Sequence, residues 1–282
     1  MRSWGDPDHL IFPRSSNKPA QATAMVEAGL DLPEPLLALA ASSHSGEPLH
    51  LDAVERILSG AGLTVDALQT PADYPLDPQE RDAWVHAGRP KAPLAMNCSG
   101  KHAAMLATCV LNGWPIDTYR DPSHPLQQGV RTTVERLAGE PVEHLGVDGC
   151  GAPVMSLSMA GLARTLSRAV QGASSDAERR VVDAMRAYPE HVGGSRRDVT
   201  AFMRAVPGLV AKDGAEGVYV AALADGTGIA IKADDGADRG RQVALARILV
   251  DLGADPQGLA DLLTIPLHGG GEVVGEVRAA MA

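Results

Sequence analysis

Cysteine is scarce in this chain of 282 residues, which contains only Cys98, Cys109 and Cys150. An odd number of cysteines in a chain this long argues against a framework of disulfide bonds and is typical of a reducing compartment. Long apolar runs are missing too: no stretch of 18 apolar residues occurs, and the first residues lack the apolar core of a signal peptide. We therefore expect a cytoplasmic protein that does not interact with membranes.

Positive charge is in deficit, because 25 basic residues face 35 acidic ones and the formal net charge is -10. With no long basic run in the sequence, nucleic acid and anionic membranes are not expected as partners. Arginine supplies most of the basic residues. An ε-amine can lose its proton in a buried site and a guanidinium cannot, so each lysine is a candidate for a chemical role. The lysines are Lys18, Lys91, Lys101, Lys212 and Lys232.

The hydrophobic content of 45% is enough to bury a substantial core. Apolar periodicity predicts helices through most of the chain and β-branched strands separated by turns in its last third. Residues 69–96 are rich in proline and charge and are expected to cross the surface. The helices are expected at about 20–28, 35–41, 51–61, 103–111, 124–137, 158–170, 175–187, 198–205, 240–252 and 256–263, and the strands at about 145–147, 209–212, 217–223, 228–232 and 273–277.

This order of elements predicts an α+β fold, in which a mainly helical lobe packs against an antiparallel sheet covered by helices. The strand at 145–147 is expected to be short and buried. No internal repeat or low-complexity tract occurs. The cleft between the two lobes is the default position for a functional site.

Ser15 and Lys18 stand three residues apart at the start of the first predicted helix. One helical turn places such positions on one face, so the Lys18 amine can reach the Ser15 hydroxyl. A lysine activates a serine only when desolvation or a nearby cation keeps the amine uncharged. Pro19 fits in a first turn, which puts Ser15 at or near the N-cap. The same spacing is common as a solvated helix start, so alone it does not assign catalysis.

Three further polar segments are candidates for lining a site. Residues 42–48 are rich in small hydroxyl side chains and form either a site loop or a simple turn and helix cap. Residues 97–102 open a helix of small and apolar residues. Residues 148–153 hold two glycines around Cys150, which indicates a tight turn that approaches another part of the molecule closely.

Five segments in this order resemble the rhizobial-type, thermolabile L-asparaginase family, and the resemblance runs from about Trp4 to the C-terminus. That family is similar in fold to serine β-lactamases and penicillin-binding proteins, so the resemblance implies such a fold and a single catalytic domain of two lobes over residues 1–282. The chain has the matching trio of Ser15-x-x-Lys18, Ser43-x-Ser45 and Lys212-x-Gly214. The five segments are 13–19, 43–47, 98–102, 148–151 and 211–217.

The activity that the resemblance implies is hydrolysis of the side-chain amide of L-asparagine to L-aspartate and ammonia through an acyl-serine intermediate. Ser15 matches the nucleophile and Lys18 its base, while Ser43 and Lys212 match a second Ser–Lys pair. A second lysine near Lys18 would lower the pKa of one of the two amines and supply the uncharged base. The backbone N–H of Ser15 is the expected oxyanion donor. Substrate contacts are expected from Arg14, His44, Asp148 and Gly214.

The family also implies a zinc ion, bound by Cys98, Lys101 and Cys150, that modulates activity rather than being strictly required. Two thiolates are ordinary zinc ligands, whereas a lysine must first lose its proton. The alternative is that both cysteines are small buried hydrophobic residues and Lys101 is a charge at a helix start. Cys109 lies in an apolar helix and is expected in the core.

Two features depart from the family. Some relatives carry a cysteine in the region matching 195–200, where this chain has none. Members usually begin with two further strands before the segment that matches residues 4–8, and a sheet without them exposes unpaired backbone groups. We therefore expect low solubility for residues 1–282 alone, improved by restoring about thirty upstream residues.

Two other functions remain open. A β-lactamase or D,D-peptidase would share the Ser–Lys trio, but no Ser-Asp-Asn or Lys-Thr-Gly motif occurs. An amino-acid-binding or zinc-binding protein of the same fold would bind without turnover. The family resemblance favours a homodimer, and the choice between asparagine and glutamine is left open.

Overall fold

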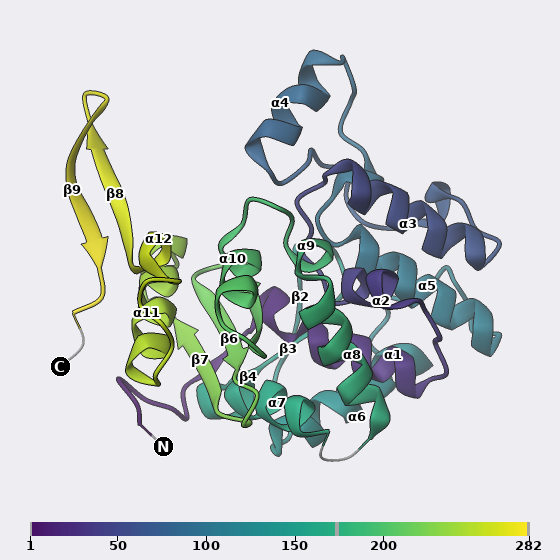
Figure 1. Cartoon of the computed structure of the whole chain (residues 1–282). Coiled ribbons are helices and arrows are strands. Elements are labelled where there is room, and N and C mark those ends of the chain that lie inside the picture. Colours follow the sequence, from purple (N-terminus) through teal and green to yellow (C-terminus); the bar gives the residue numbers. More distant parts are fainter. Residues whose placement is uncertain (1, 173–174, 281–282) are drawn as a thin grey trace.

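The computed structural model describes residues 2–172 and 175–280 as an α+β fold of many helices around small antiparallel sheets (Figure 1). The helices are α1 (Lys18–Glu27), α2 (Glu34–Ala40), α3 (Pro48–Gly60), α4 (Pro78–His86), α5 (Ser99–Asn112), α6 (Pro125–Ala138), α7 (Met159–Gln171), α8 (Asp176–Ala187), α9 (Pro189–Val192), α10 (Asp198–Ala205), α11 (Asp238–Asp251) and α12 (Ala260–Leu263), with 3₁₀ turns η1 (Arg14–Asn17), η2 (Val65–Ala67) and η3 (Pro93–Ala95).

The described strands form one sheet of three strands and three two-stranded pairs. The larger sheet has the order β5-β6-β7, with Lys212 opposite Val220 and Val220 opposite Ala230. Helices α7 and α11 pack on β6 and β7, and α10 packs on β5. The strands are β1 (Leu10–Ile11), β2 (Leu145–Val147), β3 (Pro153–Met155), β4 (Leu157–Ser158), β5 (Val210–Gly214), β6 (Val218–Ala222), β7 (Gly228–Lys232), β8 (Thr264–Gly269) and β9 (Glu272–Arg278).

Helix α1 runs through the middle of the helical part of the molecule, in contact with α5, α6, α7 and α8. Its inner positions are small, with Ala20, Ala22 and Ala24 all buried. Alanine combines high helix propensity with little side-chain volume, so several helices can approach α1 closely. The first residue of this buried helix is Lys18, which is therefore carried into the interior.

Helix ends follow local rules of capping. The Ser158 hydroxyl accepts a hydrogen bond from the Gly161 N–H at the start of α7. Gly113, just after α5, has φ +64°, and glycine enters this left-handed region without the steric cost that other residues meet. These signals explain why the predicted helices begin and end within a few residues of the observed ones.

Most predicted elements are confirmed, including the three antiparallel strands of the last third and the buried position of Cys109. The prediction of a buried strand at 145–147 is wrong in one respect. A strand is present, but Leu145 is 45% and Val147 79% exposed. The hairpin buries β3 instead, and β2 contacts the body through Gly146, which lies against the Phe12 ring.

Helix α4 was not predicted within residues 69–96, although this segment does lie at the surface. None of the residues of α4 is buried, so it has no apolar face from which periodicity could reveal it. Its start is instead fixed by Asp77, whose carboxylate accepts hydrogen bonds from the N–H groups of Gln79 and Glu80.

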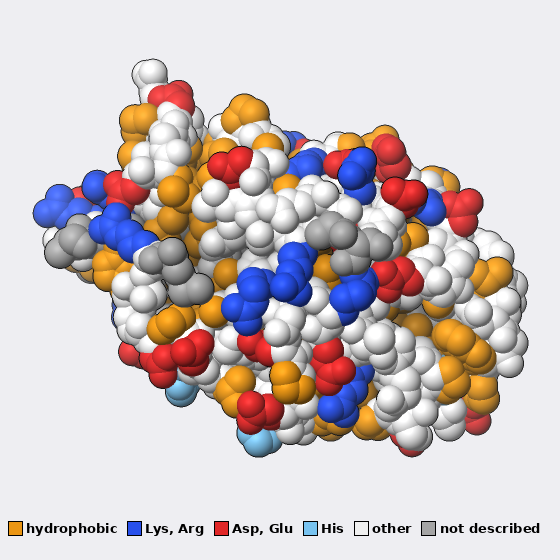
Figure 2. Space-filling model, turned by 90° about the horizontal axis from the view of Figure 1, so that it is seen from below, with side chains coloured by type: hydrophobic (Ala, Val, Ile, Leu, Met, Phe, Trp, Pro, Cys, Tyr) orange, Lys and Arg blue, Asp and Glu red, His pale blue; other side chains and the backbone are white. Residues whose placement is uncertain are grey.

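Two features project from the body in Figure 1, helix α4 and the hairpin of β8 and β9. On the face seen from below, acidic and basic side chains are interspersed over the surface (Figure 2). Over residues 2–172 and 175–280, no helix combines the length and the apolar character needed to cross a bilayer.

The close packing of α5 on α2 leads to a first testable prediction. A Cβ atom added at Gly100 would lie 2.6 Å from Leu39 Cγ and 2.9 Å from the Leu39 backbone oxygen. We expect Gly100→Ala to lower the free energy of unfolding by roughly 1–3 kcal/mol, because backbone atoms must move to admit the methyl group. Urea unfolding measures this change.

The matched control is Gly129→Ala in α6, where an added Cβ meets nothing within 4 Å. This substitution should raise the free energy of unfolding by roughly 0.5–1 kcal/mol through helix propensity alone. Equal effects of the two substitutions would contradict the close approach of α5 to α2.

Candidate active site

The segment that carries Ser15 is a 3₁₀ turn rather than the first turn of α1. Ser16 closes this turn, because its N–H and its hydroxyl both donate to the Pro13 carbonyl, at 3.1 and 2.7 Å. The N-cap of α1 is Asn17, so Ser15, expected at or near the N-cap, lies two residues before it. Ser15 is half-buried, and its hydroxyl makes no hydrogen bond within the described part of the chain.

Lys18 is buried, with only 1% of its surface exposed. Its Nζ lies 2.9 Å from Ser43 Oγ and 3.1 Å from Cys98 Sγ, and it also donates to the Ser42 carbonyl. An ammonium group has three N–H donors, and these contacts use all of them. The lysine of the Ser-x-x-Lys motif is therefore paired with the serine of the second motif, Ser43.

Lys212, on β5, is completely buried. Its Nζ donates to Asp213 Oδ1 at 2.6 Å and to the Asp213 carbonyl at 2.7 Å, so its direct partner is Asp213 rather than Ser43. Burial lowers the pKa of Lys212 to about 8, with further lowering by the charges of Lys18 and Arg197 and an opposing effect of Asp213. From the sequence, repulsion between two lysines was expected to cause such a lowered pKa, whereas burial is the larger cause at Lys212.

Asp213 balances several buried cations. Its carboxylate pairs with Arg197 and Lys212 and lies 3.7 Å from Arg241 Nη2. Burial on its own would raise the pKa of Asp213, but the charges of Arg197, Lys212 and Arg241 hold it well below its usual range. The carboxylate is therefore ionised whenever the protein is folded near neutral pH.

Gly214 explains how β5 comes to lie against the Ser15 turn. A Cβ atom at this position would lie 2.6 Å from the Pro13 carbonyl oxygen and 3.1 Å from the Ser16 nitrogen. Only glycine allows the two backbones to approach this closely. At Gly214 the backbone of the strand that carries Lys212 thus packs directly against the backbone of the turn that carries Ser15.

Arg14 and Asp148 form an ion pair beside Ser15. Arg14 Nε lies 2.7 Å from Asp148 Oδ1, and Arg14 Nη1 lies 2.8 Å from Glu216 Oε1. Arg14 has φ +52°, an uncommon left-handed conformation for a residue other than glycine. The two ion pairs stabilise this strained backbone, which directly precedes Ser15.

His44, the remaining predicted substrate contact, is fully buried. Its Nε2 lies 2.8 Å from Ser99 Oγ, and its ring stacks on His50 with the centroids 5.2 Å apart. Burial lowers the pKa of His44 well below its usual value, so the ring is neutral. These contacts hold the loop that carries Ser43.

The three predicted zinc ligands lie together in the interior. The interaction between the Cys98 and Cys150 side chains lowers the pKa of Cys150 well below its usual range and raises that of Cys98, whose thiol donates to Asn97 Oδ1 at 3.0 Å. Lys101 Nζ donates to Cys150 Sγ at 3.3 Å. Burial alone would lower the pKa of Lys101, but the charges of the Cys150 thiolate and of Asp148 raise it, so the amine is protonated.

This donor set fits zinc in its chemistry, because two sulfurs and one amine nitrogen face one another away from solvent. In the described residues, no group of three His, Cys, Asp or Glu side chains is placed to hold a metal ion, so the third ligand would have to be Lys101. A lysine binds a metal only as the neutral amine, and binding would therefore release a proton.

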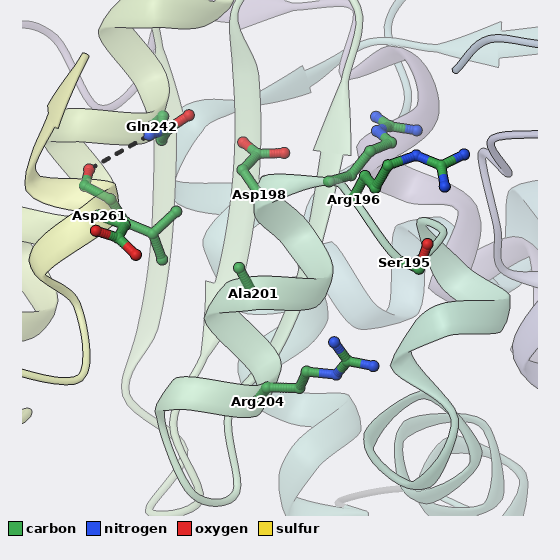
Figure 3. A pocket seen from close by; sticks show the side chains of 9 residues that line it. Ser195, Arg196, Asp198, Ala201, Arg204, Gln242 and Asp261 are labelled. Carbon is green, nitrogen blue, oxygen red and sulfur yellow. Dashed lines mark hydrogen bonds between the residues drawn. The ribbon is translucent and has the colours of Figure 1, made fainter. Parts of the chain in front are cut away.

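A pocket of about 300 Å³ lies next to the start of α10 (Figure 3). Arg197 lines it and also donates to the Ser43 carbonyl and to the Asp213 carboxylate. The residues that line it are Ser195, Arg196, Arg197, Asp198, Ala201, Arg204, Gln242, Asp261 and Leu262.

Sequence reasoning missed two residues that organise the site, Asp213 and Arg197. Asp213 could have been noticed, because Lys212 and Asp213 are consecutive charged residues within an apolar strand segment. Side chains of consecutive strand residues point to opposite faces, so two buried charges in a row indicate burial on both sides. Arg197 gives no such signal, since it stands in a polar loop among other charged residues.

The ion pairs of the buried Asp213 carboxylate lead to a second testable prediction. Asp213→Ala would leave Lys212 and Arg197 buried without their shared counter-charge, so we expect the free energy of unfolding to fall by roughly 3–5 kcal/mol. Urea unfolding at neutral pH measures this loss. The control is Asp52→Ala, which removes an exposed ion pair with Arg56 and should cost at most about 1 kcal/mol. Similar losses for both variants would contradict the central position of Asp213.

Comparison with known proteins identifies the family. The family model described as L-asparaginase II matches residues 1–279, which include every residue of the predicted site. A comparison with curated proteins gave no match. Because the family model covers nearly the whole chain, the protein belongs to the L-asparaginase II family and is an L-asparaginase.

Proposed function

We propose that the chain hydrolyses the side-chain amide of L-asparagine through an acyl-serine intermediate on Ser15, releasing ammonia and then L-aspartate. The observation that carries this proposal is that two buried lysines, Lys18 bonded to Ser43 and Lys212 on β5, belong to segments that meet at the turn of the half-buried Ser15. A soluble protein rarely buries two lysines near each other without a chemical reason, because each desolvated ammonium costs several kcal/mol.

The lysine cluster supplies the base that an unactivated amide requires. With a pKa of about 8, Lys212 is neutral in roughly a tenth of molecules at pH 7. As Ser15 Oγ attacks the amide carbon, its proton passes to the amines of the two buried lysines, Lys18 and Lys212. Ser43, which contacts Lys18 Nζ at 2.9 Å, relays a proton to the nitrogen that leaves as ammonia. Water then cleaves the acyl-serine bond and restores the Ser15 hydroxyl.

The Arg14–Asp148 pair matches the charges of a free amino acid. In the proposed complex the guanidinium of Arg14 binds the α-carboxylate and the carboxylate of Asp148 binds the α-ammonium group. Both side chains lie beside the Ser15 turn, so these contacts would direct the side-chain amide towards the nucleophile. The Ser15 N–H is the proposed oxyanion donor.

His44 and Gly214 also support the structure of the site in this proposal. His44 is neutral and hydrogen-bonded to Ser99, and Gly214 packs on the main chain at Pro13. Their expected role as substrate contacts stays a prediction.

The β-lactamase-like arrangement is part of the same proposal. It is supported by the antiparallel sheet with helices on it and by the order of the Ser–Lys motifs along the chain. We further propose that residues 1–282 act as one catalytic domain of two lobes, because the site takes residues from η1, α1 and β5. The homodimer and the cytoplasmic location stay predictions from the sequence.

Zinc is proposed as a modulating cofactor held by Cys98, Lys101 and Cys150. When bound, the ion would supply a cation next to Lys18 and thereby disfavour protonation of the amine cluster. The side chains of the chain itself provide all the proton transfers described above.

Replacement of the nucleophile tests the mechanism. Ser15→Ala should reduce ammonia release from asparagine by at least about a thousandfold, because no hydroxyl remains to form the acyl-enzyme. The control is Ser16→Ala, which removes the neighbouring hydroxyl that donates to Pro13 and should keep activity within about tenfold. Circular dichroism and melting temperature verify that both variants fold. Wild-type activity in Ser15→Ala would rule out the acyl-serine pathway.

Metal content tests the zinc proposal independently of activity. Protein purified with zinc present should hold about one ion per chain by elemental analysis, and Cys98→Ala and Cys150→Ala should each lose it. Cys109→Ala is the control and should retain the metal, because Cys109 lies in the hydrophobic core. A chelator should lower activity without abolishing it. Equal zinc content in all four proteins would exclude this site.

A further inference from the structure

The Arg197 guanidinium lies between the loop of Ser43 and the strand of Lys212. Its Nη1 donates to the Ser43 carbonyl at 2.6 Å, and its Nη2 donates to Asp213 Oδ2. Only 17% of the side chain is exposed. One residue therefore contacts both of the segments that contribute the second Ser–Lys pair.

The loop that carries Arg197 is itself fixed to the loop of Ser43. Ser45 Oγ donates to the Gly193 carbonyl at 2.6 Å, and the Ser195 N–H donates to Glu47 Oε1 at 2.7 Å. A Cβ atom at Gly194 would lie 2.3 Å from Ser45 Oγ, so the two loops are in close contact. The backbone that carries Arg197 is thus fixed by contacts between the two loops, and its guanidinium is fixed by hydrogen bonds.

Ser43 is held by every polar group that it has. Its N–H donates to the Val192 carbonyl at 3.2 Å, its hydroxyl contacts Lys18 Nζ, and its carbonyl accepts from Arg197. Without Arg197, the carbonyl side of this residue would lose its partner. Because a guanidinium has a planar fork of donors, it can serve two acceptors at once, which an ammonium group does less well.

We propose that Arg197 is a positioning residue of the site, which fixes the Ser43 loop to the Lys212 strand and shares the Asp213 carboxylate with Lys212. This inference rests on the proposed Ser–Lys mechanism, in which the amine of Lys212 must be able to give up its proton. A carboxylate that served Lys212 alone would hold that proton more firmly.

The surrounding charges support this role. Apart from burial, the charges of Lys18 and Arg197 lower the pKa of Lys212, and Asp213 raises it. Arg241 from α11 also faces Asp213, whereas the nearby Asp198 carboxyl has a raised pKa because of burial and Asp213. Removing the charge of Arg197 should therefore raise the pKa of Lys212. The Asp213 carboxylate would then also have one cation fewer beside it.

The test compares Arg197→Gln with Arg196→Gln. Arg196 precedes Arg197 in the same loop, but its three hydrogen bonds go to Asp77 and Glu80. In wild type the rate of ammonia release should rise with pH through an inflection near 8, because the neutral form of Lys212 (pKa about 8) is the active one. Arg197→Gln should move this inflection up by about one pH unit and lower kcat at pH 7 by about tenfold.

Arg196→Gln should reduce the melting temperature and leave the inflection of wild type unchanged. Arg197→Lys separates charge from geometry: the inflection should stay near that of wild type while kcat falls, because one ammonium cannot span both acceptors. This variant also decides the question if Arg197→Gln does not fold. An unchanged kcat in Arg197→Lys, or an unmoved inflection in a folded Arg197→Gln, would overturn the proposal.

A titration without substrate separates this inference from the mechanism on which it rests. The chain has few lysines, so ¹³C-labelled lysine gives a simple NMR spectrum, and Lys212→Arg identifies the Lys212 signal. Arg197→Gln should raise the pKa of that signal, and an unchanged value would refute the charge role of Arg197. If the signal moves while Ser15→Ala retains activity, the acyl-serine mechanism fails and the influence of Arg197 on Lys212 stands.

Discussion

An excess of buried positive charge is the constraint on which the rest of this site depends. The Asp213 carboxylate lies against Lys212, Arg197 and Arg241, and the charge of Lys18 acts on the Lys212 amine. A guanidinium keeps its proton under all ordinary conditions, so only a lysine can relieve the excess. Burial lowers the pKa of Lys212, and the charges of Lys18 and Arg197 lower it further, although the amine donates to Asp213, whose charge opposes this shift.

Such a cluster is unfavourable for stability, and the fold compensates for it with close packing around the site. Helix α1 is narrow enough to be enclosed by other helices, so Lys18 enters the interior on a rigid element. Gly100 and Gly214 allow backbones to approach where a methyl group would collide. The lysines are thereby held at positions that their own hydrogen bonds, made partly to backbone carbonyls, would not secure alone.

Sequence reasoning predicted a set of site residues but not the partners that the structure gives them. Periodicity located nearly all helices because each buries one apolar face, and it failed for α4, which buries none. The spacing of Ser15 and Lys18 suggested a contact within one helical turn, but the 3₁₀ turn at Ser16 directs Lys18 to Ser43 instead. Spacing describes local geometry only. The contact between Arg197 and Ser43 joins residues 154 positions apart, and no local pattern encodes it.

In the proposed mechanism, the strained backbone at Arg14 connects substrate recognition to chemistry. Arg14 and Ser15 are neighbours in the chain, so their Cα atoms are about 3.8 Å apart and neither can move without the other. Arg14 has a φ angle of +52° and pairs with Asp148 and Glu216. A substrate carboxylate that binds Arg14 in the proposed complex would compete with these acidic side chains and alter the balance that holds the turn. Binding of the amino-acid end would then be coupled directly to the position of the nucleophile, through one peptide unit.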